Sequence, residues 1–269
     1  VIFHPLICIS YSYSMGFEYI LSGFIVGLLV GLTGVGGGSL MTPLLVLIFK
    51  FPAAIAVGTD LIYAGITKSF GVFSHNKFGH INWRIVGHLM LGSIPASILM
   101  NLYIQDIDLG STETIAFIEL WLGVALIFTS AAVLSQPLII SKSKKNELYA
   151  IKNAKSFTIF LGFLLGGMVT LTSVGAGAMG ITALLLIYPK MKIKNIIGTD
   201  IAHAVPLTLF AGLGHYKLGN VDSILLISLL IGSIPGVWLG SNLSSKIDEN
   251  KLRYILVFIL LGVGTELII

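Results

Sequence analysis

Residues 27–46 read GLLVGLTGVGGGSLMTPLLV and decide the fold, because they place three consecutive glycines inside a long apolar segment. That segment covers residues 17–49, and as one helix it would be about 50 Å long, whereas the hydrocarbon core of a bilayer is about 30 Å thick. Because clustered glycines break helices, the sequence predicts two half-helices joined at residues 34–39. The apolar segment 157–189 is equally long and has a comparable break, TSVGAG, at residues 172–177.

The composition assigns the chain to the membrane. Of 269 residues, 55% are hydrophobic and only 10% are charged, whereas about 25% are charged in soluble domains. One cysteine excludes a disulfide framework and a Cys-rich metal site, and we expect no metal and no cofactor. The net charge of +4 is typical of lysine-rich cytoplasmic loops, so nucleic acid is not an expected partner.

Eight hydrophobic segments divide into two halves of four. We expect an N-terminal extension at 1–16, a first membrane repeat at 17–140, a basic cytoplasmic linker at 141–156 and a second membrane repeat at 157–269. The segments themselves cover residues 17–49, 53–74, 85–104, 114–137, 157–189, 195–214, 221–243 and 252–269.

The two halves repeat each other. The tripeptide GTD at 58–60 recurs at 198–200, and GSIP at 92–95 recurs at 232–235, both 140 residues later. At an offset of 139, the glycines 36–38 align with Gly-Ala-Gly at 175–177. Internal repeats of this kind are a common construction for transporters.

The distribution of basic residues separates two topologies. Of the 16 Lys and Arg residues, only Lys68 lies deep inside a segment, and Arg253, at the edge of the last segment, is counted with the loops. If all eight segments cross, the others divide eight to seven; if segments one and five re-enter as hairpins, they divide thirteen to two. Because positive charge concentrates on the cytoplasmic side, we favour the hairpins. Each half then crosses three times, which makes the repeats inverted.

The glycine-rich breaks are candidate anion sites. A half-helix that begins at a break points free N–H groups and the positive end of its dipole toward the membrane centre; close packing through small residues is the alternative explanation. Candidate substrate ligands come from the two breaks, the two GTD motifs and the one buried cation: Gly36, Gly37, Gly38, Ser39, Thr59, Lys68, Thr172, Ser173, Gly175, Gly177 and Thr199.

Among the ionisable side chains inside the apolar segments, where such residues usually have a function, four are candidates for the site. Lys68 requires an anionic partner, which is Asp60, Asp200 or a bound substrate. Asp60 and Asp200 are candidate proton carriers, although each could instead cap its helix. His203, three residues after Asp200, could relay protons or simply form an internal hydrogen bond. Lys68 shares its segment with Asp60, so we assign the coupling proton to Asp200 and expect Asp60 to balance the lysine.

The motifs in both halves resemble those of the TauE/SafE family of sulfite and organosulfur-anion exporters. The resemblance rests on the glycine run, on GTDLIYAGITKSFG at 58–71, on GTDIAHAVPLTLFAGLGHYKLGNVD at 198–222 and on GSIPG at 232–236. It covers about residues 17–265 and implies transport of a small anion such as sulfite or a sulfonate. The second break departs from the pattern at Ala176 and Ala178.

We therefore expect an all-α, multi-pass protein of the cell membrane (the inner or plasma membrane of a prokaryote). Its expected function is proton-coupled secondary transport of a small, sulfur-containing anion, with the lipid bilayer as its other partner. The alternatives are a passive anion channel or, with less support, a membrane enzyme or assembly factor. An enzyme is not expected, because no nucleophile with a base is visible in the sequence. The sequence does not determine the oligomeric state.

Overall fold

The structure, a computed structural model, describes residues 16–33, 38–145, 151–243 and 249–269, and within these ranges every regular element is a helix. Five of these helices, α4, α5, α6, α8 and α9, are long and apolar enough to cross a membrane, which confirms an all-α polytopic membrane protein. The helices are α1 (Phe17–Thr33), α2 (Gly38–Leu47), α3 (Ala53–Lys77), α4 (Trp83–Asp106), α5 (Thr112–Lys144), α6 (Ala154–Thr172), α7 (Ala178–Ile187), α8 (Ile193–Lys217), α9 (Ser223–Leu243) and α10 (Glu249–Glu266).

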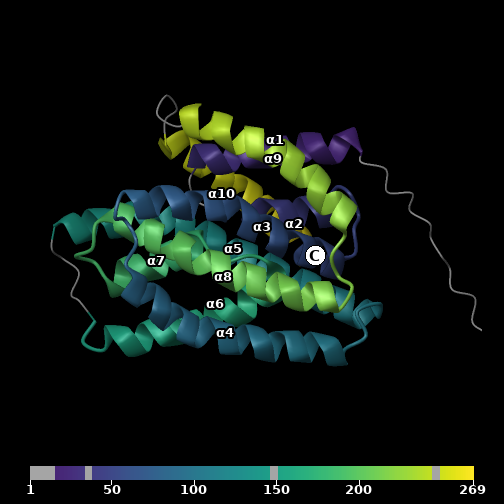
Figure 1. The fold of residues 1–269 in the computed structure, drawn as a ribbon, viewed down its shortest axis with the longest axis horizontal. Helices are drawn as coiled ribbons and strands as arrows, with labels where there is room; N and C mark the ends of the chain where they lie inside the picture. The colour runs from purple at the N-terminus through teal and green to yellow at the C-terminus, as the bar shows by residue number, and fades with distance from the viewer. Residues whose placement is uncertain (1–15, 34–37, 146–150, 244–248) are drawn as a thin grey trace, which may run out of the picture.

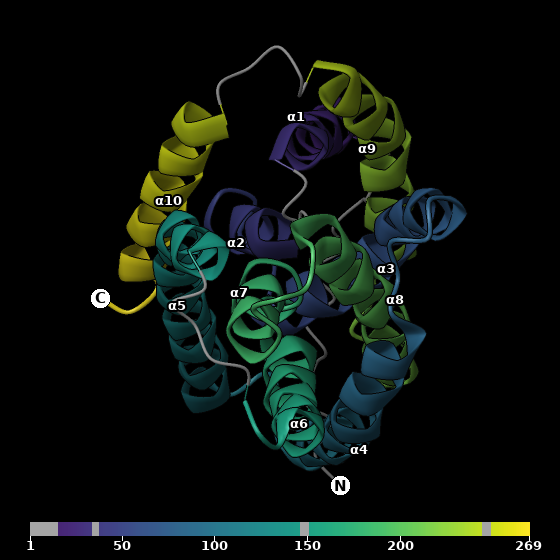
Figure 2. The ribbon, with the colours of Figure 1, turned by 90° about the vertical axis from the view of Figure 1, so that its left-hand side faces the viewer.

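The helices lie roughly along one direction and form a bundle around the two short ones (Figure 1). Seen from one end, α2 and α7 occupy the middle, with α3 and α8 on one side and α5 and α10 on the other (Figure 2). The pairs α1–α9 and α4–α6 close the bundle at its two remaining sides and are among its most extensive contacts. The short helices α2 and α7 are therefore the ones enclosed by the others.

Each of the two long apolar segments contains two helices that fold back on each other. In the second half, Thr158 Oγ1 in the first turns of α6 lies 2.8 Å from the hydroxyl of Tyr188, which follows α7. In the first half, the ring centroids of Tyr19 near the start of α1 and Phe49 after α2 are 5.0 Å apart. Both pairs are hairpins whose outer ends meet; residues 34–37, which join α1 to α2, lie outside the described residues.

Glycines bring the helix backbones into direct contact at α1–α9 and α4–α6. A Cβ atom on Gly27 would lie 2.6 Å from the backbone oxygen of Ser233, and one on Gly166 would lie 2.3 Å from that of Ser93. Gly27 and Gly166 are 139 residues apart, and Ser93 and Ser233 are 140 apart. Both halves thus use equivalent residues for the same backbone contact, of the small-residue type that packs membrane helices.

The threonines of the GTD motifs hold loops at opposite ends of the bundle. Thr199 Oγ1 accepts a hydrogen bond from the Asn82 amide at 3.0 Å, and Thr59 Oγ1 accepts one from the Asp222 amide at 3.1 Å. The first bond joins the start of α8 to the loop after α3, and the second joins the start of α3 to the loop after α8. Helices α3 and α8 are therefore antiparallel neighbours.

The stretch 141–156, expected as the linker between the two halves, is partly helical. Helix α5 continues to Lys144, and α6 already begins at Ala154, so both ends of the expected linker 141–156 are helical. Lysine is a good helix former, which lets α5 extend beyond the apolar segment that defines it in the sequence. Residues 146–150 lie outside the described part of the chain.

Candidate functional site

Three charged side chains gather inside the bundle, where α3 and α8 face the broken segments. Asp60 and Lys68 come from α3 and Asp200 from α8. Asp60 is fully buried, Asp200 is 1% exposed and Lys68 is 7% exposed. Since ionisable groups at this depth are costly unless they are partnered, their contacts indicate what each one does.

Asp60 is held by a hydroxyl from the first hairpin. Thr42 Oγ1 on α2 donates to Asp60 Oδ2 at 2.6 Å, and the Ser173 hydroxyl also interacts with the carboxylate, outside the geometry of a normal hydrogen bond. Asp60 and Asp200 are each the eighth residue of their helix, and the N-cap positions belong to Pro52 and Lys192. The helix-cap explanation considered for both aspartates is therefore wrong.

Lys68 reaches across to the second break. Its Nζ donates to the carbonyl oxygen of Ala176 at 3.1 Å. The electrostatic attraction between Lys68 and Asp200 is larger than that between Lys68 and Asp60. The sequence interpretation paired Lys68 mainly with Asp60, but eight residues along one helix correspond to about 12 Å. The antiparallel packing of α8 adds Asp200 as a second anionic neighbour of Lys68, with a larger attraction than Asp60 on its own helix.

Asp200 lies against the N-terminus of α7. A Cβ atom on Gly180, in the first turn of α7, would lie only 2.0 Å from Asp200 Oδ1, so the carboxylate occupies the space that the missing side chain leaves. The Gly177 amide adds an attractive interaction, although neither carboxylate oxygen makes a hydrogen bond of normal geometry with a described residue. The positive groups near the Asp200 carboxylate are therefore Lys68 and the N-terminus of α7.

The second break has a defined backbone. Ser173 has φ 60°, and Gly175 and Gly177 have φ 123° and 127°. Residues other than glycine rarely adopt these backbone conformations. Thr172 Oγ1 donates to the Met168 carbonyl oxygen at 2.8 Å and accepts from the Val174 amide at 3.2 Å. The break predicted at 172–177 is thus present, and it separates α6 from α7.

Of the first break, at residues 34–39, the structure describes only the last two residues. Gly38 and Ser39 form the start of α2, whereas Gly36 and Gly37, also predicted as ligands, lie outside the described residues. Thr59 and Thr199 are placed two turns into α3 and α8 with their hydroxyls bonded to loop amides. Those loop contacts occupy the two threonines that the sequence offered as ligands.

His203 joins α8 to α4. Its Nε2 atom lies 2.9 Å from Ser93 Oγ, and the side chain is fully buried. This is the internal hydrogen bond that the sequence analysis kept as the alternative to a proton relay. The bond fixes the ring one turn beyond Asp200.

Two contributors to the site were missed from the sequence. Thr42 lies within the quoted glycine-rich stretch, and its hydroxyl in an apolar half-helix was an available signal. Gly180 carried no signal alone, because its importance comes from α8 packing across the first turn of α7.

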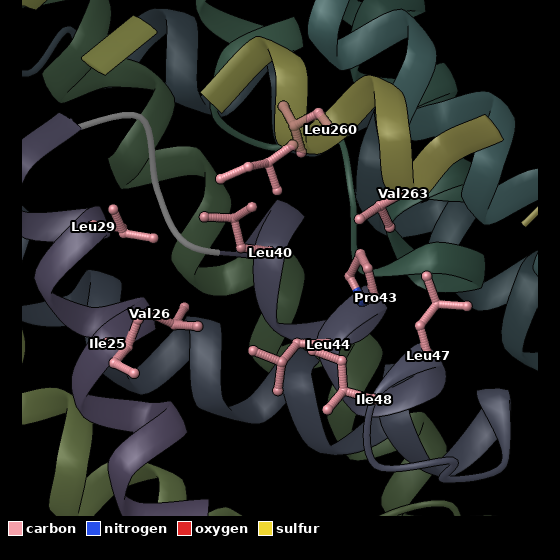
Figure 3. A pocket seen from close by; sticks show the side chains of 11 residues that line it. Ile25, Val26, Leu29, Leu40, Pro43, Leu44, Leu47, Ile48, Leu260 and Val263 are labelled. Atoms are coloured by element: carbon pink, nitrogen blue, oxygen red, sulfur yellow. The ribbon is translucent and has the colours of Figure 1, made fainter. Parts of the chain in front are cut away.

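An apolar pocket of about 210 Å³ lies elsewhere, between α1, α2 and α10. Figure 3 shows aliphatic side chains and one proline turned into it, among them Val26, Pro43 and Leu260. It offers an anion no polar partner and is distinct from the charged centre. Among the described residues, no group of three or more His, Cys, Asp or Glu side chains is placed to hold a metal ion.

Comparison with known proteins agrees with this architecture. A family model described as "Sulfite exporter TauE/SafE" matches residues 19–267. The chain is 40% identical to the probable membrane transporter protein YjnA of Bacillus subtilis, over 94% of this chain and 100% of that protein. It is 26% identical to the probable membrane transporter protein YdhB of the same organism, over 87% and 92%. It is 29% identical to the probable membrane transporter protein MJ0441 of Methanocaldococcus jannaschii, over 90% and 91%. No solved structure matches the chain.

Proposed function

We propose that this chain, which belongs to the TauE/SafE sulfite exporter family, carries a small anion across the membrane together with a proton. The family and the relatives make it a multi-pass membrane transporter. The substrate class, a sulfur-containing oxyanion or sulfonate, follows from the family's description and is part of the proposal. The observation that carries the proposal is a buried lysine between two buried carboxylates, beside the end of a broken helix.

The proposed anion site lies between the two breaks. Its ligands are the Lys68 ammonium, the Ser173 hydroxyl, the backbone amides at Gly175–Gly177 and the first amides of α2, at Gly38 and Ser39. Free amides at a helix start and a nearby cation together bind oxyanions well. The Ser173 hydroxyl supports this assignment, since it is buried without a hydrogen bond of normal geometry to a described residue.

We further propose that the two hairpins re-enter the membrane and that the halves form an inverted repeat. The antiparallel course of α3 and α8, the equivalent glycine contacts at α1–α9 and α4–α6, and the paired bonds of Thr59 and Thr199 support this arrangement. Transporters built from inverted repeats bind their substrate near the membrane centre, where broken helices meet. The charged centre occupies the corresponding place between α3, α7 and α8.

Asp200 is the proposed carrier of the coupling proton. Asp60 is fixed by a short hydrogen bond from Thr42, whereas the Asp200 carboxylate makes no hydrogen bond of normal geometry with a described residue. A group that gains and loses a proton during each cycle must not be locked in one charge state. His203, bonded to Ser93, then serves to position α8.

Counterflow and pH-driven uptake in proteoliposomes test this function. With the purified chain reconstituted, labelled sulfite, thiosulfate or methanesulfonate should accumulate transiently against an unlabelled internal pool, because a carrier exchanges its substrate. The same anion should accumulate when the outside is made acidic. With the membrane voltage held at zero by potassium and valinomycin, a passive channel gives no counterflow, so anion movement without it would overturn the carrier proposal. Counterflow that ignores the pH gradient would overturn the coupling alone.

A further inference from the structure

We infer that the Asp200 carboxylate and the transported anion occupy the same place at the N-terminus of α7, so that the anion binds only after Asp200 takes up a proton. This inference rests on the proposed function and adds how the proton and the anion are coupled. It starts from the contact between Asp200 Oδ1 and the first turn of α7 at Gly180.

The start of α7 is built to receive a negative group. Helix N-termini carry about half a positive charge and unpaired amides. Here the helix is ten residues long, its N-cap is Gly177 with φ 127°, and the residue that meets the carboxylate is a glycine. Asp200 is 1% exposed and its two oxygens lack hydrogen bonds of normal geometry within the described residues. The carboxylate therefore lies at the positive end of α7, a place whose charge also suits an oxyanion.

The charges around this position leave room for one negative group. Lys68 is the cation that faces Asp200, and Asp60 faces the same lysine. His203 follows on α8 and bonds to Ser93 of α4. Helices α2 and α7 contain no charged residue, and in α6 the one charged residue is Lys155 in the first turn. Lys68 and the N-terminus of α7 are thus the positive groups that balance two carboxylates, Asp60 and Asp200. The negative charge of a further anion beside both carboxylates would be uncompensated in a low-dielectric interior.

Protonation of Asp200 removes that conflict. A neutral carboxylic acid no longer competes for Lys68 and the positive end of α7, and the incoming anion replaces the charge that the proton cancelled. With a monovalent anion, the centre has the same formal charge before and after loading. The proton and the anion then move in the same direction, and transport of a monovalent anion carries no net charge.

Binding to the full-length chain in lipid nanodiscs tests the inference. Suitable probes are methanesulfonate, 2-hydroxyethanesulfonate and nitrate, whose own charge is constant between pH 5 and 8. For the best binder, the apparent Kd should rise with pH, by up to about tenfold per pH unit where Asp200 titrates. Close to one proton should be taken up per anion bound, measured as a pH rise in weakly buffered solution.

Asp200→Asn removes the competing charge and the titration together. Its Kd should be the same at pH 5 and pH 8, with no proton uptake, and as low as that of the wild type at pH 5. Asp222→Asn is the matched control, because Asp222 is also a carboxylate at a helix start and accepts from the Ile224 and Leu225 amides at 2.9 Å. Asparagine caps helices equally well, so this variant should keep the pH dependence.

Each other outcome has a defined meaning. Tight binding by the wild type at both pH values without proton uptake overturns the inference and leaves the proposed function intact. Proton uptake that persists in Asp200→Asn, or in Asp200→Ser if the asparagine variant does not fold, assigns the proton to another group and also overturns it. Failure of all three anions to bind at pH 5 overturns both the inference and the proposed anion site.

Discussion

At the scale of single residues, Asp60 and Asp200 occupy equivalent positions in the repeat but have different neighbours. Asp60 receives a hydrogen bond from Thr42 of α2, whereas Asp200 contacts the backbone of α7 at Gly180. At the offset of 139 residues, Gly180 corresponds to Met41, which is fully buried. A methionine side chain fills the space that a glycine leaves open. Both halves therefore contain the carboxylate, but only Asp200 contacts the start of a half-helix.

Lys68→Met should weaken anion binding by more than tenfold while the protein still folds. The variant removes the cation from the proposed site and the bond to the Ala176 carbonyl, and a buried carboxylate that loses its cation can become neutral by taking up a proton. Isothermal titration with the best-binding sulfonate measures the affinity. Lys190→Met, which removes an exposed loop lysine, is the control. A folded Lys68→Met variant with wild-type affinity would place the anion elsewhere.

Thr42→Val should lower the unfolding free energy by about 1–3 kcal/mol, the usual result when a buried acceptor loses its donor. Valine keeps the shape of threonine, so the loss reports on the 2.6 Å bond to Asp60. Thr265→Val on α10 is the control, because that hydroxyl donates to the Leu261 and Gly262 carbonyls of its own helix and is exposed. Equal denaturation midpoints for the two variants would show that the Thr42 bond adds nothing to stability.

At the scale of helices, the sequence predicts the breaks but not what they contact. Glycine clusters in over-long apolar segments identify both hairpins, and α6 and α7 end and begin at the expected residues. The sequence offers both Asp60 and Asp200 as partners of Lys68 but does not rank them, because the position of Asp200 depends on the register of α8 against α3. The same register leaves the hydroxyls of Thr59 and Thr199 to loops. Periodicity determines the helices, and packing across sequence distances of about a hundred residues determines the site.

Gly166→Ala should destabilise the chain, by about 1–3 kcal/mol if the helices move apart to relieve the overlap. Its Cβ would lie 2.3 Å from the Ser93 backbone oxygen, and backbone atoms of α4 cannot turn away as a side chain would. Gly87→Ala is the matched control, since a Cβ there meets nothing within 4 Å. Alanine at that helical position should be neutral or stabilise by up to about 1 kcal/mol. Similar unfolding curves for both variants would contradict the tight α4–α6 contact.

At the scale of the whole molecule, the basic loops gather at one end of the bundle. The loops after α3 and α7 lie at the left in Figure 1, and those after α2, α4 and α8 lie at the right. Ser143 of α5 bonds to the Pro189 carbonyl, which brings the end of α5 to the same left end. Lys77, Arg84 and Lys190 are therefore separated by the length of the bundle from Lys50 and Lys217. This arrangement is what the hairpin topology requires of a chain with positive loops inside the cell.

Single cysteines in intact cells should locate the two ends, with Lys190→Cys facing the cytoplasm and Pro52→Cys facing outward. Both positions are exposed, whereas neighbouring Phe51 is buried against Tyr19 and would react poorly from either side. With Cys8 replaced by serine, an impermeant maleimide should label Pro52→Cys in intact cells and Lys190→Cys only after lysis. If all eight segments crossed, residues 52 and 190 would lie on the same side of the membrane. Labelling of both from outside would therefore reject the re-entrant hairpins and with them the inverted repeat, whereas opposite accessibility requires an odd number of crossings between α2 and α8.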